Sequence, residues 1–399
     1  MSIIRGIIGL IVIGLIALLL SKDRKNARIK QVGILLVIMF VLAFVGLRTS
    51  FGIAILEGVS GLFNWLILQA NGGTEFVFGE GATNYGIFFL NVLMPIVFIS
   101  GLIGILQYIN VLPFIAKYLG KGINKVTGMG ENESYIAIIM AMLGQSNGFI
   151  TIKRYIDKFS PEQIFTFALM GLSCVSATTI ASYMQMVDGK FVVVAILLNV
   201  FAAFVIVSLM TPYNPQALQV DFNPIEEAKE NEGIEEENFF SVLSDYISSG
   251  FQIALAIAGS LIGFTALITF LNSLASLVFG IDFVTILGYV FSPLAYIMGV
   301  PSTDIVSAGS IMASKLLTNE FVALGEVQAV AGQVTEKTMA MMSTYVISFS
   351  NIATVGMIIA SVKIMSAKQA KVVANNTWRL IIASVLVSMI SATIVGFFF

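Results

Sequence analysis

The stretch Leu316-Leu317-Thr318-Asn319-Glu320-Phe321-Val322-Ala323 places an amide and a carboxylate side by side inside otherwise apolar sequence. A bare carboxylate costs roughly 2.5–3.5 kcal/mol to place in hydrocarbon on insertion scales. A chain tolerates such a group where it is paired, faces a cavity or binds a ligand. A second polar interruption, Gly144-Gln145-Ser146-Asn147, lies far upstream. We expect the two stretches to meet and to form one binding site.

The composition is that of a membrane protein. Of the 399 residues, 57% are hydrophobic and 11% are charged, whereas a soluble domain carries about 25% charged residues. Apolar runs of about 20 residues recur, as in transmembrane helices, and a β-barrel would show short alternating segments instead. The sequence therefore predicts an all-α polytopic protein that spans the lipid bilayer with about eight helices.

Several classes of function are excluded by what the chain lacks. It contains no histidine and one cysteine, Cys174. Ser-His-Asp hydrolysis, His-bearing zinc sites and an internal disulfide are therefore ruled out. The net charge of −2 gives no indication of nucleic-acid binding. We expect neither an enzyme nor a bound cofactor.

The distribution of positive charge predicts the topology. Five cationic residues lie between residues 22 and 30, after the first apolar run. By the positive-inside rule this loop is cytoplasmic, so the N-terminus lies outside. Counting the spans places the acidic segment 213–246 inside and the C-terminus outside. We expect a multi-pass protein of the cytoplasmic (inner) membrane.

Other segments have the character of interfacial helices. Lys117, Lys121 and Lys125 recur at four-residue spacing with apolar residues between them, which indicates an amphipathic helix over 111–127 anchored to anionic lipid. The other expected interfacial segments are 49–70 and 274–298.

The apolar segment 135–152 is broken near its middle by Gly144 to Gly148, and Lys153, Arg154 and Lys158 follow at once. Positive charge on both sides predicts that the segment enters and leaves on the cytoplasmic face. Such a re-entrant hairpin must have its polar tip buried in protein. The alternative is a loop between two short spans.

The two parts of the chain follow one plan. The first hairpin precedes a helix expected at 161–186, which carries a band of hydroxyl residues at 173–179. A second hairpin, expected at 301–324, precedes a helix at 335–362 with a similar band. Since the two hairpins are predicted to open to opposite faces, we infer an inverted repeat, with a site near the membrane midplane.

This plan predicts five parts of the chain. They are scaffold and interfacial helices at 1–130, a first transport repeat at 131–212, the acidic cytoplasmic loop at 213–246, a scaffold helix and an interfacial helix at 247–299, and a second transport repeat at 300–399. The expected site offers amides, hydroxyls and one carboxylate but no cationic cluster for phosphate, so it suits a neutral, polyhydroxylated ligand.

Four motifs resemble those of the concentrative nucleoside transporter family. They are Gly144-Gln145-Ser146, Gly171-Leu172-Ser173-Cys174-Val175-Ser176, Asn319-Glu320-Phe321-Val322-Ala323 and Ser348-Phe349-Ser350-Asn351. The similarity extends from about residue 86 onward. It implies a homotrimer with two opposed re-entrant hairpins in each protomer, and nucleoside uptake driven by sodium or protons.

The resemblance also implies roles for individual residues. Gln145 and Ser146 would face the nucleobase, Glu320 would accept hydrogen bonds from the ribose hydroxyls, and Phe349 would pack against the ligand. The full set of candidate substrate-binding residues is Gln145, Ser146, Asn147, Thr179, Glu320, Phe349, Asn351 and Thr354.

The chain departs from the family pattern at three positions. Asn147 replaces the usual acid after Gly-Gln-Ser. Met140, four residues before Gly144, and Cys174 stand where the family's sodium site has Asn and Ser. Thioether and thiol are poor ligands for a hard cation, so we treat Met140, Leu143, Cys174 and Val175 as degenerate sodium-site positions. Proton coupling through Glu320 is the favoured expectation.

Alternatives remain at this point. A channel would need a continuous polar stripe along several helices, whereas polarity here is concentrated at mid-depth. An intramembrane protease would need a paired Asp, a Ser-His pair or a zinc motif, and none is visible in the sequence. A sodium-coupled nucleoside symporter, a carrier of nucleobases or nucleoside analogues, and a nucleoside sensor that does not transport are the remaining alternatives.

Overall fold

The computed structural model describes residues 2–215, 218, 220 and 238–399, except for the side chains of Ser2 and Ser146. The glutamates of the predicted acidic loop, at positions 226–237, lie outside these described residues. Within them the chain is helical and contains no strand. The predicted all-α class is confirmed.

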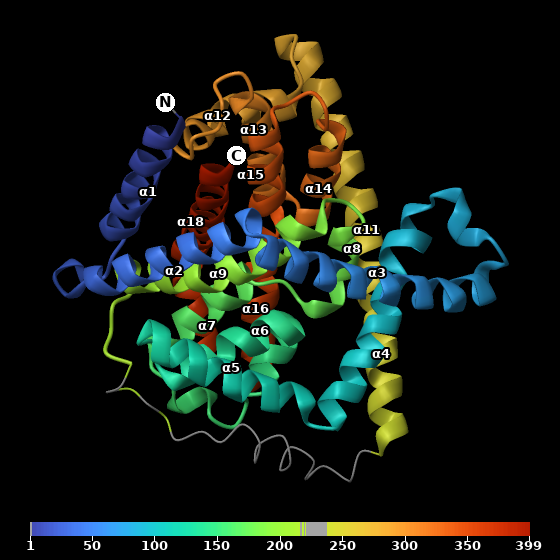
Figure 1. Cartoon of the computed structure of the whole chain (residues 1–399), viewed down its shortest axis with the longest axis horizontal. Coiled ribbons are helices and arrows are strands. Elements are labelled where there is room, and N and C mark those ends of the chain that lie inside the picture. Colours follow the sequence, from blue (N-terminus) through green and yellow to red (C-terminus); the bar gives the residue numbers. More distant parts are fainter. Residues whose placement is uncertain (1, 216–217, 219, 221–237) are drawn as a thin grey trace.

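The helices follow one another in this order: α1 (Ser2–Leu19), α2 (Ile29–Arg48), α3 (Ser50–Phe78), α4 (Pro95–Tyr108), α5 (Val111–Thr127), α6 (Glu131–Ile150), α7 (Pro161–Ser173), α8 (Ala177–Met184), α9 (Gly189–Met210), α11 (Phe239–Phe279), α12 (Phe283–Ile297), α13 (Ile305–Leu317), α14 (Glu320–Ala329), α15 (Glu336–Val346), α16 (Ile352–Met365), α17 (Ala367–Asn375) and α18 (Thr377–Val395) (Figure 1). Short 3-10 and π turns join some of them.

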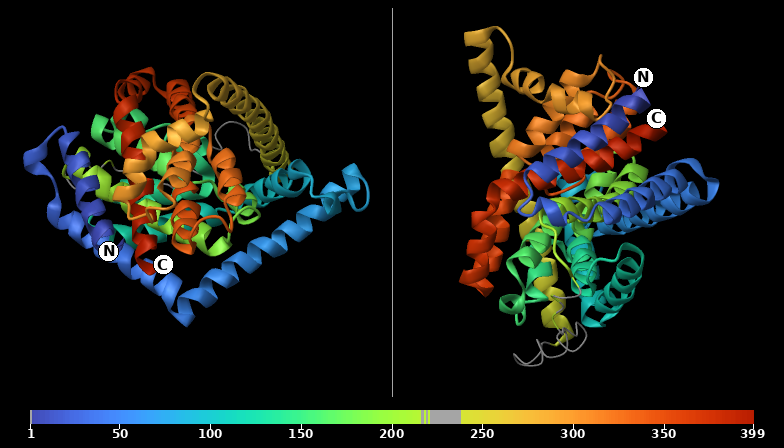
Figure 2. Two further views of the ribbon diagram at one scale, coloured as in Figure 1. Left: turned by 90° about the horizontal axis from the view of Figure 1, so that it is seen from above. Right: turned by 90° about the vertical axis from the view of Figure 1, so that its left-hand side faces the viewer.

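Buried helices form the centre, and exposed apolar helices surround them. In the part of the chain that the structure describes, seven helical segments are long and apolar enough to cross a membrane. In α18, 89% of the most apolar stretch is buried. In α11, only 6% of the corresponding stretch is buried. An exposed helix of such composition suits contact with lipid. At 41 residues, α11 is about 60 Å long and stands along one side of the molecule (Figure 2).

Hydrogen bonds join helix ends that are distant in the sequence, and they lie on two faces of the molecule. On the first, which we call the basic face, Arg28 donates to the Gly128 carbonyl at 3.1 Å, and Arg379 donates to the Leu20 and Met210 carbonyls at 3.2 and 2.8 Å. On the second, which we call the terminal face, Arg5 donates to Ser302 at 3.4 Å. The two termini lie close together in both views (Figures 1 and 2).

The two hairpins open to these two faces. The first is α6 with the segment that follows it. Its two ends lie at the basic face, where Gln163 donates to Glu133 at 3.0 Å. Inside α6 the backbone is broken at Gly144, with φ +79° and ψ 174°, which suits glycine. The second hairpin is the pair α13–α14, whose entry at Asp304 lies on the terminal face. The predicted pair of opposed hairpins is therefore present.

Both helices that were expected to carry hydroxyl bands are broken there. The expected helix at 161–186 consists of α7 and α8, separated by Cys174 to Ser176. The helix expected at 335–362 likewise consists of α15 and α16, separated at 347–351. Predicting continuous helices was wrong because Ser and Asn offer the backbone capping bonds that compete with helix continuation.

Other boundaries also differ from expectation. The segment predicted as an interfacial helix at 49–70 is part of the longer α3, which continues to Phe78. The first part of the expected interfacial segment 274–298 belongs to α11, and α12 supplies the rest. The basic segment after α16 forms α17. The amphipathic helix predicted at 111–127 matches α5.

Asp304 anchors the entry of the second hairpin to α15. Its carboxylate accepts hydrogen bonds from the Thr335 N–H at 2.9 Å, the Thr335 hydroxyl at 2.7 Å and the Thr338 hydroxyl at 2.6 Å. Burial alone would raise the pKa of Asp304, but the hydrogen bonds from Thr338, Thr303 and Thr335 outweigh it and leave the pKa below its ordinary value.

We predict that Asp304→Asn lowers the free energy of unfolding at neutral pH by about 2 kcal/mol, because the charged acceptor is lost. The folded pKa is depressed, so the stabilisation is complete above the unfolded pKa of about 3.9 and disappears as the pH falls through the folded value. Thermal unfolding in detergent at pH 7 and at about pH 2.5 should show a difference between wild type and variant that shrinks on acidification, because only the lower pH lies well below the unfolded pKa. An equal difference at both pH values would contradict this account.

Candidate functional site

Four interruptions of helices meet around one cavity of about 400 Å³. Gly144 and Gln145 come from the break in α6, and Ser176 and Thr179 from the α7–α8 break. The turn between α13 and α14 adds Asn319 and Glu320, and the α15–α16 break adds Phe349 and Asn351. Along one side lies α11, with Ser249, Ile253, Ser260 and Phe264. The two polar stretches noted in the sequence thus line the same cavity.

Three helices begin at this cavity with a side-chain cap. Ser176 accepts a hydrogen bond from the Thr178 N–H at 3.3 Å at the start of α8. Asn319 accepts from the N–H groups of Phe321 and Val322, each at 3.0 Å, at the start of α14. Asn351 accepts from the Thr354 N–H at 2.8 Å at the start of α16. The positive ends of three helix dipoles therefore lie at one polar site.

Glu320 is the first residue of α14 and is buried, with 6% of its surface exposed. Its Oε1 accepts a hydrogen bond from the Tyr183 hydroxyl at 3.1 Å, and its Oε2 accepts from the Asn351 amide at 3.4 Å. A carboxylate at a helix N-terminus is stabilised by the dipole. Elements of both repeats therefore hold the carboxyl group at the cavity wall.

The two helix breaks that follow the hairpins contact each other directly. The Phe349 N–H donates to the Cys174 carbonyl at 3.4 Å. The first hairpin packs closely on the same region. A Cβ added at Gly171, in α7, would lie 3.0 Å from the Cβ of Gln145 in the hairpin. A Cβ added at Gly144, in the hairpin, would lie 3.1 Å from the Cβ of Ser176. Glycine at these positions therefore lets the hairpin tip reach the break.

The second break is held by a buried lysine. Lys315, on α13, is 1% exposed. Its ammonium group donates to the Tyr345 carbonyl at 2.5 Å, to Ser348 at 2.6 Å and to Ser388 at 3.0 Å, and lies 4.5 Å from the centre of the Tyr345 ring. A buried charge needs such a complete set of partners. Lys315 therefore ties the second hairpin to the end of α15 and to α18.

Polar residues of the core helices complete the second break. The Asn199 amide donates to the Ile347 carbonyl at 2.6 Å, and Ser391 donates to the Asn199 carbonyl oxygen at 2.7 Å. Ser350 donates to Ser384 at 2.7 Å. The serines of α18 recur at spacings of four and three residues, so they face one side of that helix. An unwound segment inside a membrane is stable only with such partners.

The structure brings most of the predicted binding residues to the cavity. The ones that line it are Gln145, Asn147, Thr179, Glu320, Phe349, Asn351 and Thr354. The side chain of Ser146 lies outside the described part of the chain.

The positions treated as a degenerate sodium site lie behind the cavity wall. Met140, Cys174 and Val175 are buried, and Leu143 alone of the four lines the cavity. The Met140 thioether fills the space beside Gly148, where an added Cβ would lie 2.4 Å from its sulfur. Cys174 Sγ lies 4.0 Å from the Ala137 carbonyl. Among the described residues no group of three or more His, Cys, Asp or Glu side chains could hold a metal ion.

Sequence reasoning missed two residues of this site. Tyr183 follows Thr179 by one helical turn, which places both on the same face of α8. Lys315 is a single lysine inside an apolar run, and an ionisable residue in such a run is by itself an indication of function. Both signals were present in the sequence.

Family models cover nearly the whole chain. The model described as Na+ dependent nucleoside transporter N-terminus matches residues 8–81, the one described as nucleoside recognition matches 89–190, and the one described as Na+ dependent nucleoside transporter C-terminus matches 191–396. A purine nucleoside transport protein of Bacillus subtilis is 32% identical over 98% of both chains. The chain belongs to the concentrative nucleoside transporter family.

Other members of this family show how far the similarity reaches. A putative nucleoside permease of Escherichia coli is 28% identical over 100% of this chain and 99% of its own. Among solved structures, CNTnw in an inward-facing substrate-bound state matches with a TM-score of 0.90 and 29% identity, over 100% of this chain and 98% of that one. An outward-facing state of a CNTnw variant matches with a TM-score of 0.91. The fold is therefore that of the solved transporters of this family.

We predict that Lys315→Met lowers the free energy of unfolding by about 2 kcal/mol. Each hydrogen bond to a charged group contributes about 1.5–3 kcal/mol, and removing the burial cost of the ammonium group offsets part of the loss. Thermal unfolding in detergent would measure the change. Ser388→Ala is the matched control, because it removes one acceptor and leaves the other two, so its effect should be clearly smaller. Equal melting temperatures for Lys315→Met and wild type would contradict this role.

Proposed function

We propose that this protein takes up nucleosides across the cytoplasmic membrane by symport with protons. The observation that supports this most is the position of Glu320, which is buried at the start of α14 between Tyr183 and Asn351 in a cavity lined by both repeats. A buried carboxyl group that borders a cavity can accept hydrogen bonds from a ligand and can also exchange a proton.

The cavity suits a nucleoside in size and chemistry. A carboxylate forms its strongest hydrogen bonds with hydroxyl donors by charge assistance, so Glu320 would bind the ribose, with Asn351 and Thr354 beside it. Gln145 and Asn147, from the other repeat, would face the base, and Phe349 would pack against the ligand. Because the relative from Bacillus subtilis is described as a purine nucleoside transport protein, we include purine nucleosides in the first tests.

The proposed coupling to protons rests on the residues behind the cavity. Met140 and Cys174 present sulfur atoms where the family resemblance implies oxygen ligands for sodium, and sulfur is a poor ligand for a hard cation. Glu320 is then the proton carrier. Release of its proton on the cytoplasmic side and reloading outside would couple the two fluxes.

Opposed hairpins support a mechanism of alternating access. We propose that the basic face is cytoplasmic, because the cationic loops lie there, and that the terminal face and both termini lie outside. In line with the family resemblance, the working form is proposed to be a homotrimer.

The central test is uptake of radiolabelled inosine and uridine into proteoliposomes under an imposed proton or sodium gradient. We expect proton-driven accumulation by wild type and at least a tenfold loss in Glu320→Gln, which keeps the size of the side chain but removes the charge and the exchangeable proton. Glu57→Gln, an exposed acid on α3, is the matched control and should transport normally.

Each other outcome has a definite meaning. Uptake that ignores the pH gradient but follows sodium would overturn proton coupling and keep nucleoside transport. Transport of a free nucleobase but no nucleoside would show a changed substrate. Saturable binding without uptake would indicate a sensor.

A second prediction concerns the degenerate sodium positions. The double substitution Met140→Asn and Cys174→Ser supplies two oxygen ligands at the buried position where the chain has sulfur. We expect uptake by this variant to gain a dependence on sodium of several-fold, measured by replacing sodium with choline at constant pH. Wild type is the reference and should show none. The same sodium response in both proteins would contradict the interpretation.

A further inference from the structure

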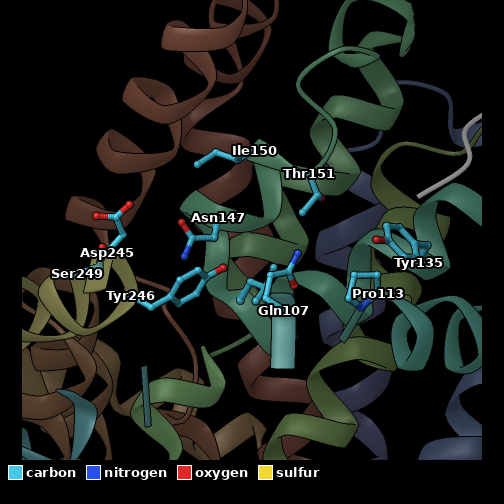
Figure 3. A pocket seen from close by; sticks show the side chains of 10 residues that line it. Gln107, Pro113, Tyr135, Asn147, Ile150, Thr151, Asp245, Tyr246 and Ser249 are labelled. Carbon is cyan, nitrogen blue, oxygen red and sulfur yellow. The ribbon is translucent and has the colours of Figure 1, made fainter. Parts of the chain in front are cut away.

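A second polar cavity, of about 320 Å³, lies between α4, α5, α6 and α11. Figure 3 shows Asn147 and Thr151 of the first hairpin on one side and Asp245, Tyr246 and Ser249 of α11 on the other. Gln107, from the end of α4, also lines the cavity. Seven of its ten lining residues carry a polar side-chain atom.

This cavity adjoins the central one. Leu143, Asn147 and Ser249 line both. On α11, residues that line the cavities recur every three or four positions. Asp245 and Ser249 line the second cavity, and Ile253, Ile257 and Ser260 line the central one. One face of a single helix therefore runs past both spaces. The second cavity lies beyond the tip of the first hairpin, in the direction of its Lys153–Lys158 end.

The second cavity is more polar than the groove between α3, α4 and α11. The groove between α3, α4 and α11, of about 490 Å³, is lined among its described residues by one polar side chain, that of Thr74, as suits an apolar occupant. In the second cavity, by contrast, Gln107 Oε1 is buried and has no hydrogen-bond partner. A buried acceptor without a partner is costly. Both Asp245 and Asn147 are exposed side chains that can turn to a ligand there.

We propose that this second cavity is a weaker nucleoside-binding subsite, next to the central site on its cytoplasmic side. The proposal rests on the function proposed above. The Asp245 carboxylate and the Gln107 carbonyl oxygen accept hydrogen bonds from ribose hydroxyls, or from the amino groups of a base. Asn147 serves both sites, since its amide lies at their junction.

The two sites use similar chemistry. Each contains a carboxylate and a side-chain amide: Glu320 and Asn351, which are hydrogen-bonded, in the first, and Asp245 and Gln107, which line the same cavity, in the second. A neutral ligand rich in hydroxyl donors that leaves the central site therefore finds acceptors of the same kind before it reaches water. Asn147 suits this double position better than an acid would. An acid at position 147 would line the same cavity as the Asp245 carboxylate, and the two negative charges would repel each other.

The test is equilibrium binding of tritiated inosine and tritiated uridine to the purified full-length protein. We expect wild type to show two saturable phases, the second at least tenfold weaker than the first. Glu320→Gln should lose the tight phase and keep the weak one. Adding Asp245→Ala and Gln107→Leu to Glu320→Gln should abolish the weak phase, whereas adding Glu57→Ala, which removes an exposed acid elsewhere, should leave it.

Thermal unfolding would show whether each variant is folded. If the combined variant does not fold, Asp245→Asn alone in the Glu320→Gln background should weaken the remaining phase several-fold. Loss of all saturable binding in Glu320→Gln, or a weak phase that survives the changes at Asp245 and Gln107, would overturn the second subsite and leave the proposed function intact. Absence of nucleoside binding in wild type would overturn both.

Discussion

The structure depends on one constraint, which is that backbone groups inside a membrane need partners within the protein. Four helix interruptions lie around the central cavity, and each one exposes N–H and C=O groups that a continuous helix would satisfy. Side chains supply the partners here. Ser176, Asn319 and Asn351 cap three new helices, and Lys315 with Asn199 and the serines of α18 satisfies the second break.

The same constraint explains why the proposed binding site lies where it does. The polar side chains that cap the broken helices lie around one cavity, which is therefore polar without further residues. Glu320 is held there because Tyr183, Asn351 and the start of α14 together stabilise its carboxyl group. Asn351 therefore both caps α16 and lines the cavity, so a substitution there would act on the fold and on the proposed binding site.

Much of this was readable in the sequence, but not all of it. The hairpin break at Gly144, the acid Glu320 and the amphipathic helix α5 follow from local patterns of charge, glycine and periodicity. The breaks after Ser173 and Val346 were expected as bands on continuous helices, because hydrophobicity alone does not distinguish a capped break from a polar helix face. The second cavity has no local signal, since Gln107, Asn147 and Asp245 come from three separate elements.

The sequence by itself determined that the chain is an all-α membrane protein and that two polar stretches, at Gly144–Asn147 and at Asn319-Glu320, interrupt its apolar segments. Composition and periodicity are properties of single segments, so one sequence suffices to read them. The tertiary structure alone decided which side chains meet. Tyr183 with Glu320, Phe349 with Cys174, and Lys315 with Ser388 are joined by long-range packing, and such pairings depend on how the helices cross, which no local pattern encodes.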